Sequence, residues 1–460
     1  MIDVARGGSL CMLDAKQRMA RADAINFTAD VVRATNLTQR QLDAGVLMPQ
    51  DSGRSLRICH PSPGMPMVAA ALGGSVTAGL TFSVRQDPNG ILWHARLGAL
   101  LSRRLSGPVV MRNLGVPAMG PWYANQCTRA RAPQHRFHLA LVEYAINTEA
   151  RSDLDEYEQL LKWTSAAMPT IAVHSARWAC STRHGKPGAL KLPLREDADH
   201  AAIEAEMEAI AARHGVIVVS LRRAARVSAA FPADGSFMAD CSHPSLLGHT
   251  QLAVLVDYAL SRAVAARSRT SIFAKSIARQ SCGLKAWPAN LGAETCFLAG
   301  ALAHVRSDNF TLGEYAPGKL ALIPARGATS ARLTYPYQGG PGKPIWLVLG
   351  IVVSWRSERV QGELFCVAGC SCERASFQHW HPQRTTVSEP IKLWLRPVRG
   401  ASACTLHMIS PPRITAVIPG GDSKRGAHWH TNQAVARADG MCIGKKGRQV
   451  ACEPHTFDVG

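Results

Sequence analysis

The chain has 460 residues, of which 47% are hydrophobic and 18% charged. We expect two domains, because this length exceeds what one ordinary core organises, and the composition excludes disorder throughout. The net charge of +19 is spread out: residues 1–282 hold 32 basic and 22 acidic residues, and residues 283–460 hold 20 and 11. A nucleic-acid-binding protein usually concentrates such charge on one face, so we expect no nucleic-acid partner. We interpret the charge as affinity for polyanions, either acidic polysaccharides or an anionic membrane surface.

The thirteen cysteines are an odd number, and in an oxidising compartment most of them would pair. No apolar run reaches the roughly 18 residues of a membrane span, so we expect none. The first 30 residues lack the charged-then-apolar pattern of a signal peptide. The cysteines favour the secretory pathway or an extracellular location, as do the glycosylation sequons at Asn26, Asn36 and Asn309. The oligomeric state stays unknown.

Residues 1–64 show no strong periodicity and end in a Pro-rich turn, so we interpret them as an N-terminal extension. From residue 67 short apolar runs alternate with amphipathic helical patterns, the first of which spans 93–105. This alternation predicts an α/β domain over residues 65–266, with a mostly parallel sheet covered on both faces. The expected strands are 68–72, 109–112, 139–144, 170–173 and 216–220.

The helical period disappears after a basic stretch, which we interpret as a linker over residues 267–282. Short strand-like runs separated by Gly and Pro clusters follow, and they predict a β-rich, sandwich-like C-terminal domain over residues 283–460. The expected strands are 320–323, 332–335, 345–353, 363–367, 391–395 and 405–409.

Four groups of polar residues follow strands of the predicted parallel sheet or precede its last helix. Ser75 comes after the first strand, the loop 113–120 after the second, Asn147 after the third, and Asp240 with His243 before the helix. Functional groups collect at the carboxyl ends of parallel strands, so we expect these groups to meet.

Their chemistry is that of nucleophilic catalysis. A serine hydroxyl is a poor nucleophile until an imidazole removes its proton, and a carboxylate orients the imidazole and stabilises its cation. In the sequence Asp240-Cys241-Ser242-His243 a turn allows the carboxylate to reach Nδ1 and leaves Nε2 for Ser75. Attack on an ester creates an oxyanion, which requires preorganised donors. The Ser75 N–H, a backbone N–H of the second loop and the Asn147 amide are the candidates.

These segments resemble the SGNH (GDSL-type) hydrolases over residues 67–262. The first block is 74–79, the second 113–118, the third 142–147 and the fifth 240–244, and their wording is closest to a branch common in algae and related protists. The resemblance implies a flavodoxin-like, three-layer α/β/α fold without a cofactor or metal. It also implies catalytic Ser75, His243 and Asp240, and an oxyanion hole made by Ser75, Ala118 and Asn147.

Three residues depart from the family's pattern: Gly74 stands where Asp is usual, Ala118 where Gly is usual, and Thr148 where Asp is usual. None of these changes removes a reacting group. They leave open whether Gly115 or Gly120 replaces Ala118 as the backbone donor. His174 also ends a predicted strand and is a candidate for the substrate pocket.

A second cluster contains Cys366, Cys370 and Cys372, followed by His379 and His381. Closely spaced thiolates and imidazoles can hold zinc, and disulfides within a β domain explain the same pattern. The sequence leaves both alternatives open.

We expect a serine esterase that cleaves an acyl ester through an acyl-enzyme, with a small-molecule or glycan ester as substrate. Carbohydrate O-acetyl groups are the preferred class, because the resembled family includes such enzymes and appended β domains often bind glycans. The alternative is a catalytically inactive carbohydrate-binding or cell-surface protein that has kept the fold.

Overall fold

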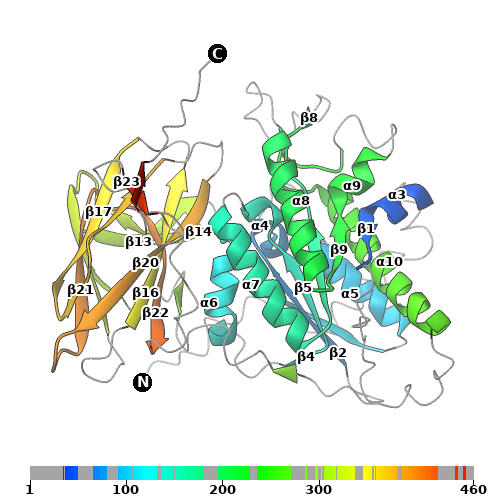
Figure 1. The fold of residues 1–460 in the computed structure, drawn as a ribbon, viewed down its shortest axis with the longest axis horizontal. Helices are drawn as coiled ribbons and strands as arrows, with labels where there is room; N and C mark the ends of the chain where they lie inside the picture. Colours follow the sequence, from blue (N-terminus) through cyan, green and yellow to red (C-terminus); the bar gives the residue numbers. More distant parts are fainter. Residues whose placement is uncertain are drawn as a thin grey trace.

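The structure is a computed structural model. It describes residues 35, 37–49, 66–79, 92–105, 107–131, 136–148, 151–179, 195–227, 236–270, 285–286, 296–298, 302, 305–316, 319–336, 345–354, 357, 359–380, 386–422, 441–443 and 449–451. An α/β region and a C-terminal β region lie side by side (Figure 1). Below, "α/β region" means the described residues of 37–270 and "β region" those of 296–422.

The α/β region is built on a six-stranded sheet of order β1-β9-β6-β5-β2-β3. Five strands run parallel, and the short β1 pairs antiparallel with β9 at one edge. The predicted parallel sheet is confirmed. Both ends of each of the five expected strands lie within one residue of the ends of an observed strand. The strands are β1 (Val46–Leu47), β2 (Met67–Gly73), β3 (Val109–Asn113), β5 (Leu139–Glu143), β6 (Thr170–His174) and β9 (Ile217–Ser220).

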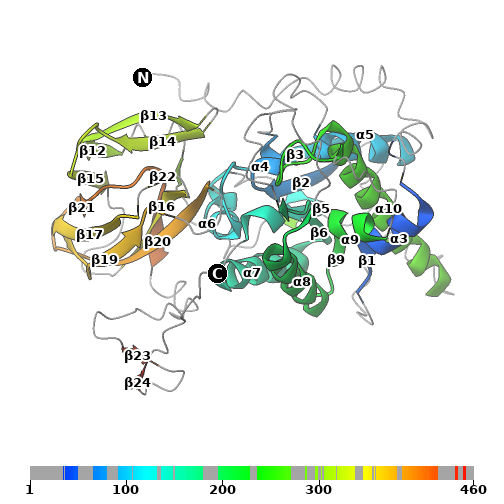
Figure 2. The ribbon, with the colours of Figure 1, turned by 90° about the horizontal axis from the view of Figure 1, so that it is seen from above.

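Helices cover both faces of this sheet, which gives the three predicted layers (Figure 2). Side chains of β2 alternate between the faces: Ala69 and Ala71 lie in one apolar core, Ala70 and Leu72 in the other. The first core is covered by α3 (Gln39–Gly45), α5 (Trp93–Arg104), α9 (Leu221–Arg226) and α10 (Leu246–Thr270), the second by α6 (Pro121–Arg131), α7 (Arg151–Ala167) and α8 (Ala198–Arg213). Within the described residues no helix is both long and apolar enough to cross a membrane.

Part of the expected N-terminal extension belongs to this region. Thr38 caps α3 through a capping box with Gln41, and Leu42 and Val46 are buried in the first apolar core. These residues therefore differ from the loose extension that the sequence predicted. A seven-residue helix followed by a two-residue strand is too short to show a periodic pattern. The expected linker begins inside α10, and residues 271–282 lie outside the described residues.

The β region consists of a seven-stranded and a five-stranded sheet, both antiparallel, around a shared apolar core. This confirms the predicted β-rich C-terminal fold. The first sheet contains β11 (Phe297–Leu298), β13 (Phe310–Ala316), β14 (Lys319–Pro324), β16 (Ile345–Ser354), β18 (Cys370–Ser371), β20 (Thr386–Pro397) and β22 (Ile414–Asp422). The second contains β12 (Arg306–Asp308), β15 (Ser330–Pro336), β17 (Gln361–Ala368), β19 (Ala375–Gln378) and β21 (Ala403–Ile409).

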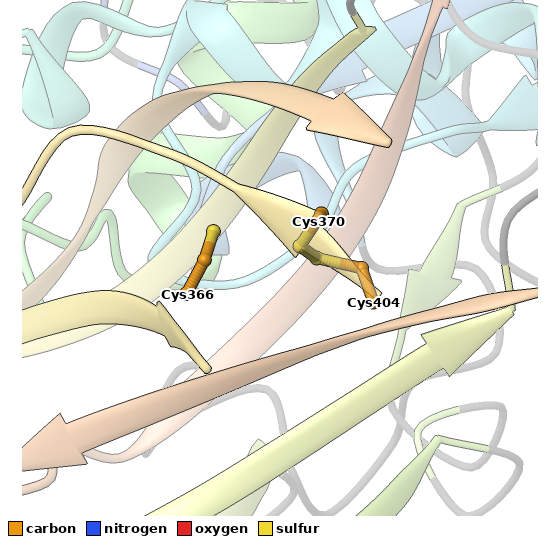
Figure 3. Close-up of side chains that lie close together, drawn as sticks. All are labelled: Cys366, Cys370 and Cys404. Atoms are coloured by element: carbon orange, nitrogen blue, oxygen red, sulfur yellow. A yellow bond between two sulfur atoms is a disulfide. The ribbon is translucent and has the colours of Figure 1, made fainter. Parts of the chain in front are cut away.

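Four cysteines of the β region form two disulfides, Cys366–Cys372 and Cys370–Cys404. Figure 3 shows the second of these bonds, with Cys366 beside it. The sulfurs are therefore bonded to each other and are not thiolate ligands here. His379 Nε2 lies 2.7 Å from the carbonyl oxygen of Ser410. A carbonyl oxygen can only accept, so His379 is the donor. His381 lies outside the described residues.

The two regions are joined by covalent, apolar and ionic contacts. Cys127 of α6 forms a disulfide with Cys296, next to β11. Lys392 Nζ of β20 lies 2.9 Å from Glu156 Oε1 of α7. A separate apolar cluster fills the contact and consists of Met119, Trp122, Tyr123, Cys127, Val348, Ala416 and Ile418.

Candidate active site

The strand order places the candidate site at the reversal point of the sheet. In chain order the parallel strands are β2, β3, β5, β6 and β9, and in space β2 lies between β3 and β5. The chain thus passes from β2 to β3 on one side of β2 and then adds β5, β6 and β9 on the opposite side of β2. In open α/β sheets the crevice beyond the carboxyl ends at such a point is where ligands bind. Ser75 follows β2 and Asn147 follows β5, so both lie at this end of the sheet, beside the reversal point.

Ser75, His243 and Asp240 form a continuous hydrogen-bond chain. Ser75 Oγ lies 2.7 Å from His243 Nε2, and His243 Nδ1 lies 2.8 Å from Asp240 Oδ2. An ionised carboxylate can only accept, so Nδ1 carries the proton and Nε2 is left to accept from the Ser75 hydroxyl. The chain can therefore move a proton from serine to imidazole, which activates the serine for attack.

Asp240 is held by a turn of its own backbone. Its Oδ1 accepts the N–H groups of Ser242 and His243, each at 2.8 Å. Burial alone would raise the pKa of Asp240, but the His243 charge and these hydrogen bonds lower it below its ordinary value. The carboxylate is therefore ionised at neutral pH and faces the imidazole as an anion. Cys241, between the two residues, is disulfide-bonded.

Gly74 brings Ser75 close to Asn147. A Cβ added at Gly74 would lie only 1.8 Å from Asn147 Oδ1, so no larger residue fits without moving the amide. Asn147 closes the short 3-10 turn η2 (Ala145–Asn147) and is 8% exposed. The departure from the family's pattern at Gly74 thus has a local steric reason, and the carboxamide lies against the residue that precedes the serine.

Ala118 has a left-handed backbone, with φ of 62°. Met119 N donates to Val116 O at 3.3 Å across a turn in which Pro117 is second and Ala118 third. Proline second and positive φ third are typical of a type II turn, which favours glycine at the third position. Alanine in this conformation costs about 1–2 kcal/mol.

The N–H of Ala118 has no acceptor among the described residues. The same holds for Ser75, the first residue of α4 (Ser75–Ala78), whose N–H has no partner within the helix. Gly115, in contrast, donates its N–H to Asn113 Oδ1 at 2.9 Å, which leaves it unsuited to bind an oxyanion. The free N–H groups therefore favour Ala118 over Gly115 as the second-loop donor.

Glu143 is a buried carboxylate under the site that the sequence reasoning missed. Thr77 Oγ1 donates to its Oε2 at 3.1 Å and Ser175 Oγ to its Oε1 at 2.8 Å. Burial raises the pKa of Glu143 to about 7, although these hydrogen bonds and the nearby His243 charge oppose the rise. Glu143 is the last residue of a buried strand, and only its charge within an apolar run could have indicated it.

Stability is expected to depend on pH through Glu143. Its pKa is higher in the folded than in the unfolded chain, so the free energy of unfolding falls as pH rises from about 4.5 to about 7. We expect Glu143→Gln to remove this part of the dependence. When the pH is raised from 4.5 to 8, the free energy of unfolding of the variant should rise by about 2–3 kcal/mol relative to that of the parent. Urea unfolding at both pH values measures the difference. Glu206→Gln, at an exposed position of α8, is the control, and an equal gain in both variants contradicts the prediction.

His174 does not line the crevice as proposed from sequence. It is fully buried, and its Nε2 lies 3.1 Å from Tyr157 OH. Beneath it Arg222 Nε donates to Glu204 Oε2 at 2.6 Å, with both side chains 2% exposed. Ser220 Oγ donates to the other oxygen of Glu204 at 2.8 Å. His174, Glu204 and Glu208 have ligand-type atoms within 4.8 Å of one another, a spacing that a metal site also shows. Because the Arg222 guanidinium already neutralises Glu204, this cluster is best explained as a structural ion-pair network.

Glu204→Ala is expected to destabilise the protein strongly. It would remove the buried carboxylate of the Arg222 guanidinium, which then keeps, among the described residues, only its longer ion pair with the exposed Glu196, at 3.5 Å. Breaking one side of a buried pair typically costs about 3–5 kcal/mol. Thermal unfolding followed by circular dichroism measures the loss. Glu206→Ala, two residues further on the same helix and exposed, is the matched control. A melting temperature within 1–2 °C of the parent, roughly the effect of a surface substitution, would refute the structural role.

No protein-family model matches the sequence, and no curated protein does. Among solved structures, a two-domain esterase active on acetylated mannans, co-crystallised with mannopentaose, is 12% identical over 77% of this chain and 91% of its own, with a TM-score of 0.46. A lipase/acylhydrolase from Enterococcus faecalis is 17% identical over 44% of this chain and 96% of its own, with a TM-score of 0.32. An acetyl xylan esterase from Geobacillus stearothermophilus is 15% identical over 41% and 91%, with a TM-score of 0.31. At these identities the similarities concern the fold alone.

Proposed function

We propose that the protein is a serine esterase of the SGNH type. The observation that carries the proposal is the hydrogen-bond chain from Asp240 through His243 to Ser75, with distances of 2.8 and 2.7 Å, at the reversal point of the sheet. A buried serine whose hydroxyl meets a carboxylate-oriented imidazole is arranged for nucleophilic attack.

In the proposed reaction Ser75 Oγ attacks the carbonyl carbon of the ester while His243 Nε2 takes the hydroxyl proton. The oxyanion accepts hydrogen bonds from the N–H groups of Ser75 and Ala118 and from the Asn147 carboxamide. Collapse breaks the bond to the leaving alkoxide, which receives the proton from His243. Water then attacks the acyl-enzyme with His243 as the base, and the acid and free Ser75 are released.

The substrate class to test first is an O-acetyl group on a carbohydrate, because the resembled family includes such enzymes and appended β domains often bind glycans. Acetylated mannan and acetylated xylan are suitable test polymers, with p-nitrophenyl acetate as the small ester. Release of acetate from either polymer supports this class, and activity on the small ester alone restricts the proposal to an acyl esterase of other specificity.

Covalent labelling tests the proposal without a choice of substrate. The full chain is treated with a fluorophosphonate and analysed by peptide mass spectrometry. We expect one adduct, on Ser75. It should not form when the protein is denatured before the reagent is added, and it should be absent from Ser75→Ala. An unlabelled native parent, or equal labelling of parent and variant, contradicts a nucleophilic Ser75 and favours an inactive protein that has kept the fold.

A further inference from the structure

The β region contacts the loop that carries Ala118. Ser388 N, in β20, donates to Ala118 O at 2.8 Å, and Met119 and Ser388 form a parallel bridge. Trp122 Nε1, at the start of α6, donates to Ser388 O at 3.1 Å. Both polar groups of the Ser388 backbone are thus directed at the α/β region. Figure 2 shows α6 beside β20 at this contact.

Ser388 offers this N–H because its position in the sheet leaves it unused. Ser388 stands opposite Val352 of β16, and Pro390 stands opposite Gly350. In an antiparallel pair the N–H groups of alternate residues point away from the partner strand. Pro390, two residues further along β20, has no N–H and is tolerated because the backbone nitrogen at its position points away from β16. The N–H of Ser388 points in the same direction. The Ser388 N–H therefore serves the Ala118 carbonyl and not the ladder of β16 and β20.

The contact lies on a buried part of the β region. Ser388 Oγ lies 2.6 Å from Thr415 Oγ1, which donates to Gly350 O at 3.0 Å. Ser388 is 4% and Thr415 3% exposed. A Cβ at Gly350 would lie 3.0 Å from the Trp122 ring, so the ring lies directly on the sheet. The Ser388 hydroxyl is thus bonded within the β region, and the bonds that reach the α/β region come from the Ser388 backbone, on a closely packed surface.

We infer that the β region positions the oxyanion loop, with Ser388 as the positioning residue. The inference rests on the proposed function for its catalytic consequence. A left-handed alanine persists only where its surroundings impose it. The hydrogen bond from Ser388 N fixes the Ala118 carbonyl. Because the carbonyl and the N–H of Ala118 belong to the same turn, the bond also fixes the direction of the Ala118 N–H. The β region is then part of the catalytic site and not only an appended module.

Ser388→Pro tests the inference, because it removes the N–H that reaches Ala118 and leaves the ladder with β16 intact. Ser388→Ala keeps this N–H and loses only the hydroxyl, so it is the matched control. Loss of one oxyanion donor typically lowers kcat about 100- to 1000-fold, so we expect a misplaced one to cost about 10- to 100-fold. The KM of Ser388→Pro is expected to stay within about two-fold of the parental value, because the change does not touch ground-state binding. The kcat of Ser388→Ala is expected to stay within about three-fold of the parental value.

A rescue experiment separates positioning from a general loss of structure. Glycine adopts positive φ without strain, so Ala118→Gly is expected to restore part of kcat in the Ser388→Pro background. A variant that is merely partly unfolded would show fewer active sites by burst titration, an unchanged kcat per site and no rescue. That result overturns the inference.

Amide hydrogen exchange gives a readout that does not require esterase activity. In Ser388→Pro we expect faster exchange over residues 114–120 and unchanged exchange over β16, with neither change in Ser388→Ala. If β16 also exchanges faster, Trp122→Phe decides, because it removes the donor to Ser388 O, keeps an aromatic ring on the sheet and leaves the β20 backbone unchanged. Faster loop exchange in that variant supports the inference, and parental exchange overturns it. If the parent proves to be no esterase, the proposed function fails while the exchange result still judges whether the β region holds the loop.

Discussion

Ser75→Ala is expected to lower kcat/KM for p-nitrophenyl acetate by at least about 10⁴-fold. The methyl group cannot form an acyl-enzyme, and what remains is the stabilisation of the oxyanion by the backbone and Asn147. KM is expected to change little, because the hydroxyl contributes chiefly in the transition state. Initial rates at saturating and limiting ester concentrations separate the two effects.

The matched control is Ser376→Ala, at an exposed position of β19 in the β region. It removes the same atom and is expected to leave kcat/KM unchanged. If Ser75→Ala retains more than about a tenth of the parental rate, another group performs the hydrolysis. A parent that is itself inert toward small esters and toward both acetylated polymers would instead favour the carbohydrate-binding alternative.

The central part of the fold could be predicted because short apolar runs, four of the five largely buried as parallel strands, alternate with helical patterns. The run that ends at Gly74 and Ser75 is typical: its residues alternate between two apolar cores, which only a sheet covered on both faces provides. The juxtaposition of the candidate residues followed from the same pattern, because parallel strands end at one edge and the chain order brings Ser75, Asn147 and Asp240–His243 to that edge. The assignment to an algal or protist branch stays a prediction.

Other features leave no local signal in the sequence. The strand β1 has two residues and pairs with β9, 171 positions further along, and Val46 faces Val219 only because α3 packs beside it. The Ser388–Ala118 bond joins residues 270 positions apart. It depends on how two complete sheets dock, which is decided by the apolar cluster around Trp122. Glu143 was missed because one acidic residue within an apolar strand does not indicate what it bonds.

Asp240→Asn is expected to lower kcat about 10⁴-fold while the site keeps its shape. The Asn carbonyl oxygen can take the place of Oδ1 and accept the two backbone N–H groups of Ser242 and His243. The amide NH₂ then stands where Oδ2 accepted from His243 Nδ1. Two donors cannot bond to each other, so the imidazole proton moves to Nε2, and the group that should accept the Ser75 proton becomes a donor. Geometry is kept, and the base is lost.

The pH dependence of this variant distinguishes a wrong tautomer from a lost fold. A base stronger than water can partly replace the imidazole, so we expect the residual rate of Asp240→Asn to rise with hydroxide concentration at high pH. Thermal unfolding of the variant should stay close to that of the parent. Asp155→Asn, at an exposed position of α7, makes the same chemical change away from the site and should keep full activity. A variant with more than a tenth of the parental kcat would show that His243 works without Asp240. The carboxylate would then hold the turn through its bonds to Ser242 and His243 and take no part in orienting the imidazole.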